Sequence, residues 1–318
     1  MVSIGYFLSC EEFGPRELVR LAKKAEQAGF ERLWISDHFH PWLDEEGNSP
    51  FVWSVIGALS ETTSLPITTA VTCPLIRIHP AIVAQAAATA AVQCEGRFVL
   101  GVGSGEALNE HVTAERWPPP RVRREMLAEA VQVIRQLHGG KQISHRGKHY
   151  RVENARVYTL PDQPVPNYIS GFGPSATTLA AELGDGFCTV GPQADLVRTY
   201  RDAGGSGPVQ GGFKVCWADS EDEGVQTAHR LWRNELLLGS LPTTLPTPND
   251  YAAASSLVTE DMMRDHLACG PDADRHIAEV RKFVDAGFDE VYVQQIGPQQ
   301  DEFFDAWQKA VLPNISGY

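Results

Sequence analysis

The chain has 318 residues, of which 43% are hydrophobic and 21% charged, a composition typical of soluble globular proteins. Forty Asp and Glu against 27 Lys and Arg give a formal net charge of −13, which argues against nucleic acid or an anionic membrane as a partner. No apolar run approaches the roughly 20 residues of a membrane span, and the N-terminus lacks a basic signal segment, so we expect a cytoplasmic protein. The six cysteines are scattered without a Cys-x-x-Cys pair, so neither a zinc site nor a disulfide framework is expected.

A helix, a glycine and a short apolar strand follow one another at three separate places. In the first, residues 15–28 place Leu and Ala at helical spacing, Gly29 can end the helix in a left-handed conformation, and the segment 30–36 is apolar. The same order recurs around Gly184 and Gly287. Repetition of this unit indicates a parallel sheet whose strands are connected by covering helices.

Eight segments have the length and apolar character of strands. They are residues 2–8, 32–36, 67–71, 97–102, 167–170, 186–190, 212–217 and 289–294. Because eight is the strand number of a TIM barrel, we predict an α/β protein with a single (β/α)8 TIM-barrel domain over residues 1–318. An open doubly wound sheet is the alternative, but it usually carries a dinucleotide fingerprint after its first strand, and residues 9–14 do not form one.

Two stretches are additional to the strand–helix units of a minimal barrel. Residues 141–165 alternate polar and apolar side chains and then contain several prolines, which predicts an inserted hairpin and loop. Residues 239–260 are rich in Pro, Thr and Ser and contain no Lys or Arg, which predicts a long surface loop or a lid.

The unusual residues follow the predicted strands, where a TIM barrel builds its active site. The second strand leads into 36–42, Ser-Asp-His-Phe-His-Pro-Trp, and the third into 71–74, Val-Thr-Cys-Pro. The fourth leads into the glycine-rich segment 101–111, and the fifth is followed by Gly-Phe-Gly-Pro-Ser at 171–175. We therefore expect these loops to meet at one mouth.

Each loop suggests a chemistry and a plainer structural alternative. A histidine after the second strand, His38 or His40, is suited to act as a general base near neutral pH. His-x-His also begins some metal sites on this fold, but matching ligands after later strands are missing, so we expect no metal. Glu106 can serve as a proton donor or as a solvated turn residue. The helix start after Gly173 offers N–H groups to a phosphate.

Together, the segments 36–42 and 101–110 resemble the luciferase-like superfamily, and within it the coenzyme F420-dependent glucose-6-phosphate dehydrogenase family. The second segment reads Gly-Val-Gly-Ser-Gly-Glu-Ala-Leu-Asn-Glu. The likeness continues to the Ala-Gly-Phe-Asp-Glu-Val-Tyr-Val segment at 286–293, and so covers most of the chain.

This resemblance implies a deazaflavin across the barrel mouth and a non-prolyl cis peptide near Ala70-Val71. The residues that would line its ring and ribityl chain are Asp37, Val71, Cys73, Ser104, Gly105, Glu106 and Asn109. Those that would approach its phosphate are Gly171, Phe172 and Gly173. By similarity, His38 takes the hydroxyl proton of the substrate, Trp42 shields the reacting face, and Glu106 assists protonation at the ring nitrogen. A homodimer is also implied.

The sequence departs from this family where the sugar phosphate is bound. The two lysines and the arginine that hold the phosphate there fall at Pro192-Gln193, within 239–260, and near His266, with Arg264 close by. We therefore expect a neutral alcohol, or a carbonyl or enone, in place of glucose 6-phosphate.

Three other readings stay open. The first is an FMN-dependent monooxygenase of the same superfamily. The second is a metal-dependent hydrolase built around His38 and His40, and the third is a carrier that binds the cofactor without turnover.

Overall fold

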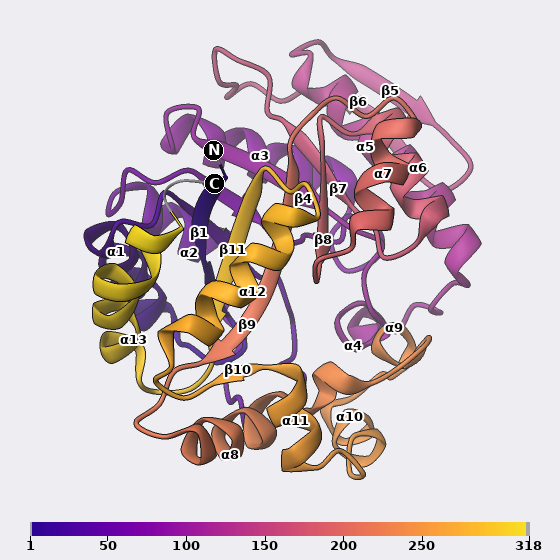
Figure 1. Cartoon of the computed structure of the whole chain (residues 1–318). Helices are drawn as coiled ribbons and strands as arrows, with labels where there is room; N and C mark the ends of the chain where they lie inside the picture. The colour runs from indigo at the N-terminus through magenta and orange to yellow at the C-terminus, as the bar shows by residue number, and fades with distance from the viewer. Residues whose placement is uncertain (1, 316–318) are drawn as a thin grey trace.

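Eight parallel strands close into a ring in the computed structural model, which describes residues 2–315 (Figure 1). The order β11-β1-β2-β3-β4-β7-β8-β9 closes because β9 pairs with both β8 and β11, so the predicted barrel is confirmed. The strands are β1 (Ser3–Leu8), β2 (Arg32–Ile35), β3 (Ile67–Thr69), β4 (Phe98–Val102), β7 (Asn167–Ser170), β8 (Gly186–Val190), β9 (Val209–Cys216) and β11 (Glu290–Gln295).

Helices between the strands form the outer layer of the barrel (Figure 1). They are α1 (Pro15–Ala28), α2 (Val52–Ser60), α3 (Pro80–Gln93), α5 (Pro120–His138), α6 (Pro174–Leu183), α7 (Ala194–Asp202), α8 (Glu221–Trp232), α12 (Ala273–Asp285) and α13 (Gln300–Ala306). As predicted, Gly29 ends α1 in a left-handed conformation with φ of 95°. No helix among residues 2–315 is long and apolar enough to cross a membrane.

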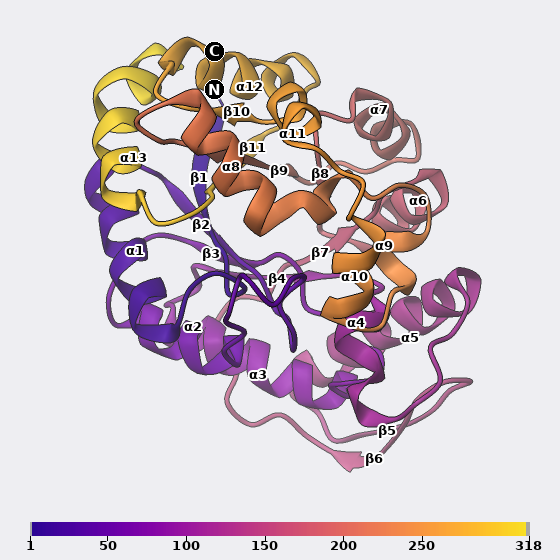
Figure 2. The ribbon, with the colours of Figure 1, turned by 90° about the horizontal axis from the view of Figure 1, so that it is seen from below.

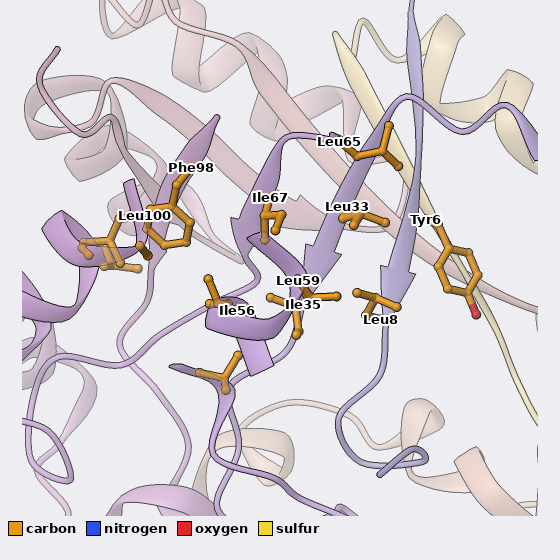
Figure 3. Packing of buried hydrophobic residues seen from close by; sticks show 14 of the residues in the cluster. Tyr6, Leu8, Leu33, Ile35, Ile56, Leu59, Leu65, Ile67, Phe98 and Leu100 are labelled. Atoms are coloured by element: carbon orange, nitrogen blue, oxygen red, sulfur yellow. The ribbon is translucent and has the colours of Figure 1, made fainter. Parts of the chain in front are cut away.

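Apolar side chains fill the layer between strands and helices. Figure 3 shows Leu33 and Ile35 of β2 beside Ile67 of β3, with Ile56 and Leu59 of α2 packed against them. All five are fully buried. Burial at this helix–sheet layer is the main source of stability for the fold.

The inside of the barrel holds side chains as well. Trp34 stacks on Tyr292 with ring centroids 4.5 Å apart. The Gln210 amide accepts from Trp34 Nε1 at 2.9 Å and donates to Glu290 at 2.7 Å. Because this interior is packed, a ligand site has to lie at an end of the barrel.

Strand β9 starts at Val209, three residues before the predicted start at Gly212. A Cβ on Gly211 would lie 2.6 Å from the Phe288 ring, and one on Gly212 would lie 2.4 Å from Trp34. These glycines therefore belong to the strand and make room for neighbouring aromatic rings.

The predicted hairpin is present as β5 (Ile143–Arg146) and β6 (Arg151–Ala155), which pair antiparallel. Glu129 of α5 accepts hydrogen bonds from the backbone N–H groups of His149 at 3.0 Å and Tyr150 at 2.8 Å. The hairpin is therefore fastened to the outer surface of α5.

Helices replace most of the long loop predicted at 239–260. They are α9 (Leu241–Thr244), α10 (Pro248–Ala254) and the start of α11 (Glu260–His266). The hydroxyls of Thr247 and Thr259 accept hydrogen bonds from the first turns of α10 and α11. With α4 (Ala107–Glu110) and α8, these helices gather at the carboxyl ends of the strands (Figure 2). This segment, called the lid below, lies at the rim of the mouth (Figure 2).

Candidate active site

His38 and Glu11 meet at the mouth of the barrel, from the ends of β2 and β1. His38 Nδ1 lies 3.4 Å from Glu11 Oε1 and 3.2 Å from the His40 carbonyl oxygen. The Glu11 carboxylate is buried, and its Oε2 accepts from Ser9 Oγ at 2.8 Å and Ser36 Oγ at 2.7 Å. Two hydroxyl donors thus hold the carboxylate that faces the imidazole.

This arrangement selects one tautomer of His38. Both neighbours of Nδ1 are acceptors, so Nδ1 carries the hydrogen and Nε2 keeps its lone pair. An imidazole that gains a proton at Nε2 becomes a cation beside the Glu11 carboxylate. The geometry is that of a general base with an orienting acid behind it.

Trp42 connects this base to the lid. Its ring lies edge-on to His38, with centroids 4.8 Å apart, and edge-on to Tyr251 of α10 at 5.2 Å. The Tyr251 hydroxyl donates to the Pro242 carbonyl oxygen at 2.9 Å. Trp42 therefore packs against both His38 and the lid residue Tyr251.

Glu46 fixes the turn that carries Trp42. Its Oε2 accepts from the Trp42 backbone N–H at 2.8 Å, whereas Oε1 is buried without a hydrogen-bond partner among the described residues. Burial, with the negative charges of Glu11 and Glu12 nearby, raises the pKa of Glu46 well above its ordinary value.

Asn109 binds the His38 loop to the loop after β4. Its side-chain oxygen accepts from the backbone N–H groups of Phe39 at 2.8 Å and His40 at 3.2 Å. Its amide nitrogen lies 3.5 Å from Glu106 Oε2. The structure thus brings His38, Asn109 and Glu106 into one region. The side-chain oxygen of Asn109 already accepts hydrogen bonds from the loop backbone.

Asp37 belongs to a buried ion-pair network. Its carboxylate accepts from Thr72 Oγ1 and from Arg77 Nη2, each at 2.7 Å. Arg77 Nε also lies 3.5 Å from Glu110, whose carboxylate accepts from the Arg77 backbone N–H at 2.8 Å. Both carboxylate oxygens of Asp37 already have hydrogen-bond partners within the protein. Asp37 therefore holds together the loops beneath the mouth.

Close backbone packing shapes the β3–β4 side of the mouth. The Ala70–Val71 peptide is cis, as expected from the resemblance. A Cβ on Gly103 would lie 2.6 Å from Val71 Cγ2, and one on Gly105 would lie 2.5 Å from Cys73 Sγ. Ser104 lies between these glycines and is half-buried. Glycine is required here because the loops after β3 and β4 touch.

The start of α6 offers a different surface. A Cβ on Gly173 would meet nothing within 4 Å, no side chain caps the helix, and Phe172 is 63% exposed. A Cβ on Gly171, in contrast, would lie 3.0 Å from Ala176 in the first turn of α6. The open approach to uncapped backbone N–H groups fits a phosphate.

Glu12 occupies the corner beside the Glu11 site. It accepts from Trp232 Nε1 at 2.7 Å, Gln294 Nε2 at 3.1 Å and the Gly297 backbone N–H at 2.8 Å. Burial outweighs these three donors and raises the pKa of Glu12 to about 7. Several carboxyl groups therefore surround this side of the mouth.

The cations near this side are already paired. Lys214 of β9 lies 2.7 Å from Glu235 and 4.4 Å from the centre of the Trp232 ring. Arg264 of α11 pairs with Asp222 at 2.8 Å and Glu221 at 3.3 Å. Neither is an open counter-ion for a substrate phosphate.

Two further histidines at the mouth each have a ring nitrogen within hydrogen-bond distance of a backbone carbonyl oxygen. His40 Nδ1 lies 2.9 Å from the Leu108 carbonyl oxygen, and His111 Nδ1 lies 2.7 Å from that of Ala107. Within residues 2–315, no group of three or more His, Cys, Asp and Glu side chains is placed to hold a metal ion.

Three functional contributors were not singled out from sequence: Glu11, Arg77 and Lys214. Glu11 directly follows the first strand, so its position at a strand end was the available signal. Arg77 and Lys214 had no such signal, because each is defined by an ion pair to a segment distant in sequence.

Comparisons with known proteins identify the family of the chain. The model of the luciferase-like monooxygenase family matches residues 2–290. An F420-dependent glucose-6-phosphate dehydrogenase of Amycolatopsis mediterranei is 31% identical and covers 99% of each chain. One from Mycobacterium avium is 33% identical, over 99% of this chain and 98% of the relative.

Solved structures extend the comparison. An F420-dependent secondary alcohol dehydrogenase, in complex with an F420-acetone adduct, is 32% identical, covers 99% of each chain and has a TM-score of 0.91. A coenzyme F420-dependent tetrahydromethanopterin reductase from Methanopyrus kandleri, at 22% identity and a TM-score of 0.76, shares the fold. The chain therefore belongs to the luciferase-like family, together with F420-dependent dehydrogenases that match it along nearly their whole length.

Proposed function

We propose that this protein is a coenzyme F420-dependent oxidoreductase that interconverts an alcohol and the corresponding carbonyl compound, or reduces an enone. The observation that carries the proposal is the His38–Glu11 pair at a mouth whose other side is lined by glycine turns. The relatives named above, including the alcohol dehydrogenase with a TM-score of 0.91, support the cofactor and the class of reaction.

The residues present fit the cofactor. Val71, Cys73, Ser104, Gly105 and Glu106 would border the deazaflavin ring and ribityl chain, and Gly173 and the uncapped start of α6 would receive its phosphate. When bound, F420 supplies the carbon that accepts or returns the hydride. Asp37 and Asn109 would hold the surrounding loops, since their oxygens already have protein partners.

The proton moves through His38. In the oxidation direction, Nε2 accepts the hydroxyl proton of the alcohol while Glu11 stabilises the imidazolium, and in the reduction direction the same atom returns it. Trp42 excludes water from this step, because its ring lies between His38 and the lid residue Tyr251. Glu106 would exchange a proton with the cofactor ring.

The substrate is a neutral molecule. Glu11 and Glu46 are buried and Glu12 is half-buried on the substrate side, and Lys214 is already paired with Glu235. A phosphate dianion drawn into this corner would meet carboxyl groups without an open cation, which is strongly unfavourable. Glucose 6-phosphate is therefore excluded from the proposal.

A titration of the purified protein with F420 and with FMN tests the cofactor, followed by quenching of tryptophan fluorescence. We expect tight binding of F420 and weak binding of FMN, and then reduction of bound F420 by small secondary alcohols but not by glucose 6-phosphate. Preference for FMN would favour a monooxygenase, and oxidation of glucose 6-phosphate would overturn the neutral substrate.

We also propose a homodimer in the cytoplasm. Helices α2 and α3 contain no charged residue, although Ile82 and Val92 of α3 are 56% and 40% exposed. Such an uncharged apolar surface is typical of an interface between copies of one chain. Analytical ultracentrifugation should give twice the chain mass, and Ile82→Lys with Val92→Glu should give the monomer.

A further inference from the structure

Arg123 is a buried cation that forms no ion pair with any residue in the range 2–315. It lies in the first turn of α5, and only 3% of the residue is exposed. Its Nη1 donates to the Pro118 carbonyl oxygen at 3.0 Å, and its guanidinium lies 4.5 Å from the centre of the Trp117 ring. Its Nε–H is buried without a hydrogen-bond partner among the described residues.

This arrangement is costly for an arginine. A carbonyl oxygen and an aromatic face compensate only part of the hydration that a guanidinium loses on burial, and an unmatched buried charge is strongly destabilising. Burial accordingly lowers the pKa of Arg123. Arg77 shows the contrast, because it is also buried but lies 2.7 Å from the Asp37 carboxylate.

Arg123 lies on the cofactor side of the mouth. The neighbouring carboxylate whose negative charge acts on it is Glu106, in the loop after β4, and Arg124 is the nearby cation. Strands β4 and β7 end side by side here, since a Cβ on Gly103 would lie 3.6 Å from Ser170 Cβ. Helix α5 also packs against α6, whose uncapped start follows β7.

We propose that Arg123 binds the anionic part of the cofactor that follows the ribityl chain, either its phosphate or a carboxylate of its tail. The inference rests on F420 as the cofactor. The unused Nε–H and the remaining guanidinium donors match an anionic oxygen pair in the bidentate way that arginine favours. Arg123 adds the charge that the backbone N–H groups of α6 lack.

The surrounding charge supports an anionic ligand. Residues 116–156 contain ten Lys and Arg against three Asp and Glu, in a chain with a formal net charge of −13. This segment contains α5 and the β5–β6 hairpin, so the positive charge is concentrated on one side of the barrel. Such a field attracts an anionic cofactor toward the side that holds Arg123.

The test compares Arg123→Met with the wild type for binding of three probes, measured by tryptophan quenching. The probes are F420, the deazaflavin riboside without a phosphate, and the same riboside with a 5′-phosphate. We expect Arg123→Met to bind F420 about 10- to 100-fold more weakly and the riboside unchanged. Arg135→Met, in the same helix and paired with Asp185, is the matched control and should bind all three normally.

The phosphorylated riboside identifies the group that Arg123 binds. A loss equal to that for F420 assigns the phosphate, and no loss assigns a carboxylate of the tail. Equal losses for the riboside and F420 would overturn the proposal, because they indicate a structural role through Trp117. Unchanged F420 binding would also overturn it, whereas failure of the wild type to bind F420 would overturn the proposed function itself.

The stability of the cofactor-free protein gives an independent readout. If Arg123 serves a ligand, Arg123→Met removes an unmatched buried charge, and the cofactor-free variant should be as stable as the wild type or more stable. F420 should then raise the melting temperature of the wild type more than that of the variant. A less stable cofactor-free variant would contradict the proposal.

Discussion

The two sides of the barrel mouth are built on opposite principles. On the β1–β11 side, the buried Glu11 and the half-buried Glu12 accept hydrogen bonds from several donors, and His38 faces Glu11. On the β4–β7 side, some glycines leave the backbone open and others let the loops pack closely. Arg123, the buried cation on this side, has no carboxylate partner among the described residues. The first side is suited to moving a proton and the second to binding an anionic ligand.

The two sides therefore serve different purposes: the acidic side suits proton transfer, and the glycine-lined side suits binding of an anionic ligand. An acidic corner repels a phosphate but stabilises an imidazolium, so it suits a neutral substrate that exchanges a proton. Backbone N–H groups and a cation suit an anionic cofactor that must be held in one position for hydride transfer. Changes on the first side should alter turnover or pH dependence, and changes on the second should alter cofactor affinity.

Replacement of His38 tests this separation most strongly. His38→Ala should lower kcat about 10²- to 10⁴-fold, because the base is lost, while F420 affinity stays within a few-fold. Steady-state kinetics and a binding titration measure both effects. His40→Ala is the control, since its ring bonds to a backbone carbonyl, and it should cost less than tenfold. A parallel loss of F420 affinity in His38→Ala would show that the two sides are not independent.

Replacement of Glu11 tests whether its negative charge assists His38. Glu11→Gln should lower kcat about 10²-fold, because the amide no longer fixes the tautomer of His38 or neutralises its imidazolium. Glu11→Asp should recover part of this loss. Single-turnover reduction of F420 by an alcohol measures the effect at the chemical step. Equal rates for the Gln and Asp variants would show that the charge of Glu11 has no part in the reaction.

Glu12 gives the acidic side a predicted pH signature. Its pKa rises from 4.5 to about 7 in the folded protein, so folding favours the protonated form. Stability from Glu12 is therefore fully present below pH 4.5 and is lost as the pH rises to about 7, by about 3 kcal/mol.

The measurement is the free energy of unfolding in urea at pH 5 and pH 8. Relative to wild type, Glu12→Gln should gain about 3 kcal/mol between these pH values, because glutamine does not ionise. Glu153→Gln, at an exposed position in the hairpin, should follow the wild type. Parallel pH profiles for Glu12→Gln and the wild type would contradict the raised pKa.

The smallest effect is expected at the lid. Tyr251→Phe removes the hydrogen bond to the Pro242 carbonyl and should lower the free energy of unfolding by about 1 kcal/mol, with a KM change below threefold. Tyr158→Phe, at an 81% exposed ring, is the control and should have no effect. A large rise in KM for Tyr251→Phe alone would give the hydroxyl a direct part in substrate binding.

The barrel and the position of its mouth could be predicted because they depend on local patterns. Apolar segments of strand length, helices ended by glycine and polar loops after the strands define a parallel barrel. The same logic placed His38, Trp42, Glu106 and the start of α6 around one mouth. Residues 239–260 were harder, because helices of four to seven residues have too few turns for a clear hydrophobic period.

The sequence by itself determined the eight-stranded barrel, the loops that form the site and the absence of the family's phosphate-binding cations at their expected positions. Only the tertiary structure decided that Glu11 faces His38, that Asp37 pairs with Arg77, and that the buried Arg123 has no carboxylate partner among the described residues. The physical reason is that a strand or helix is set by neighbouring residues. The charge state and role of a buried group are set by partners that the fold brings from distant segments.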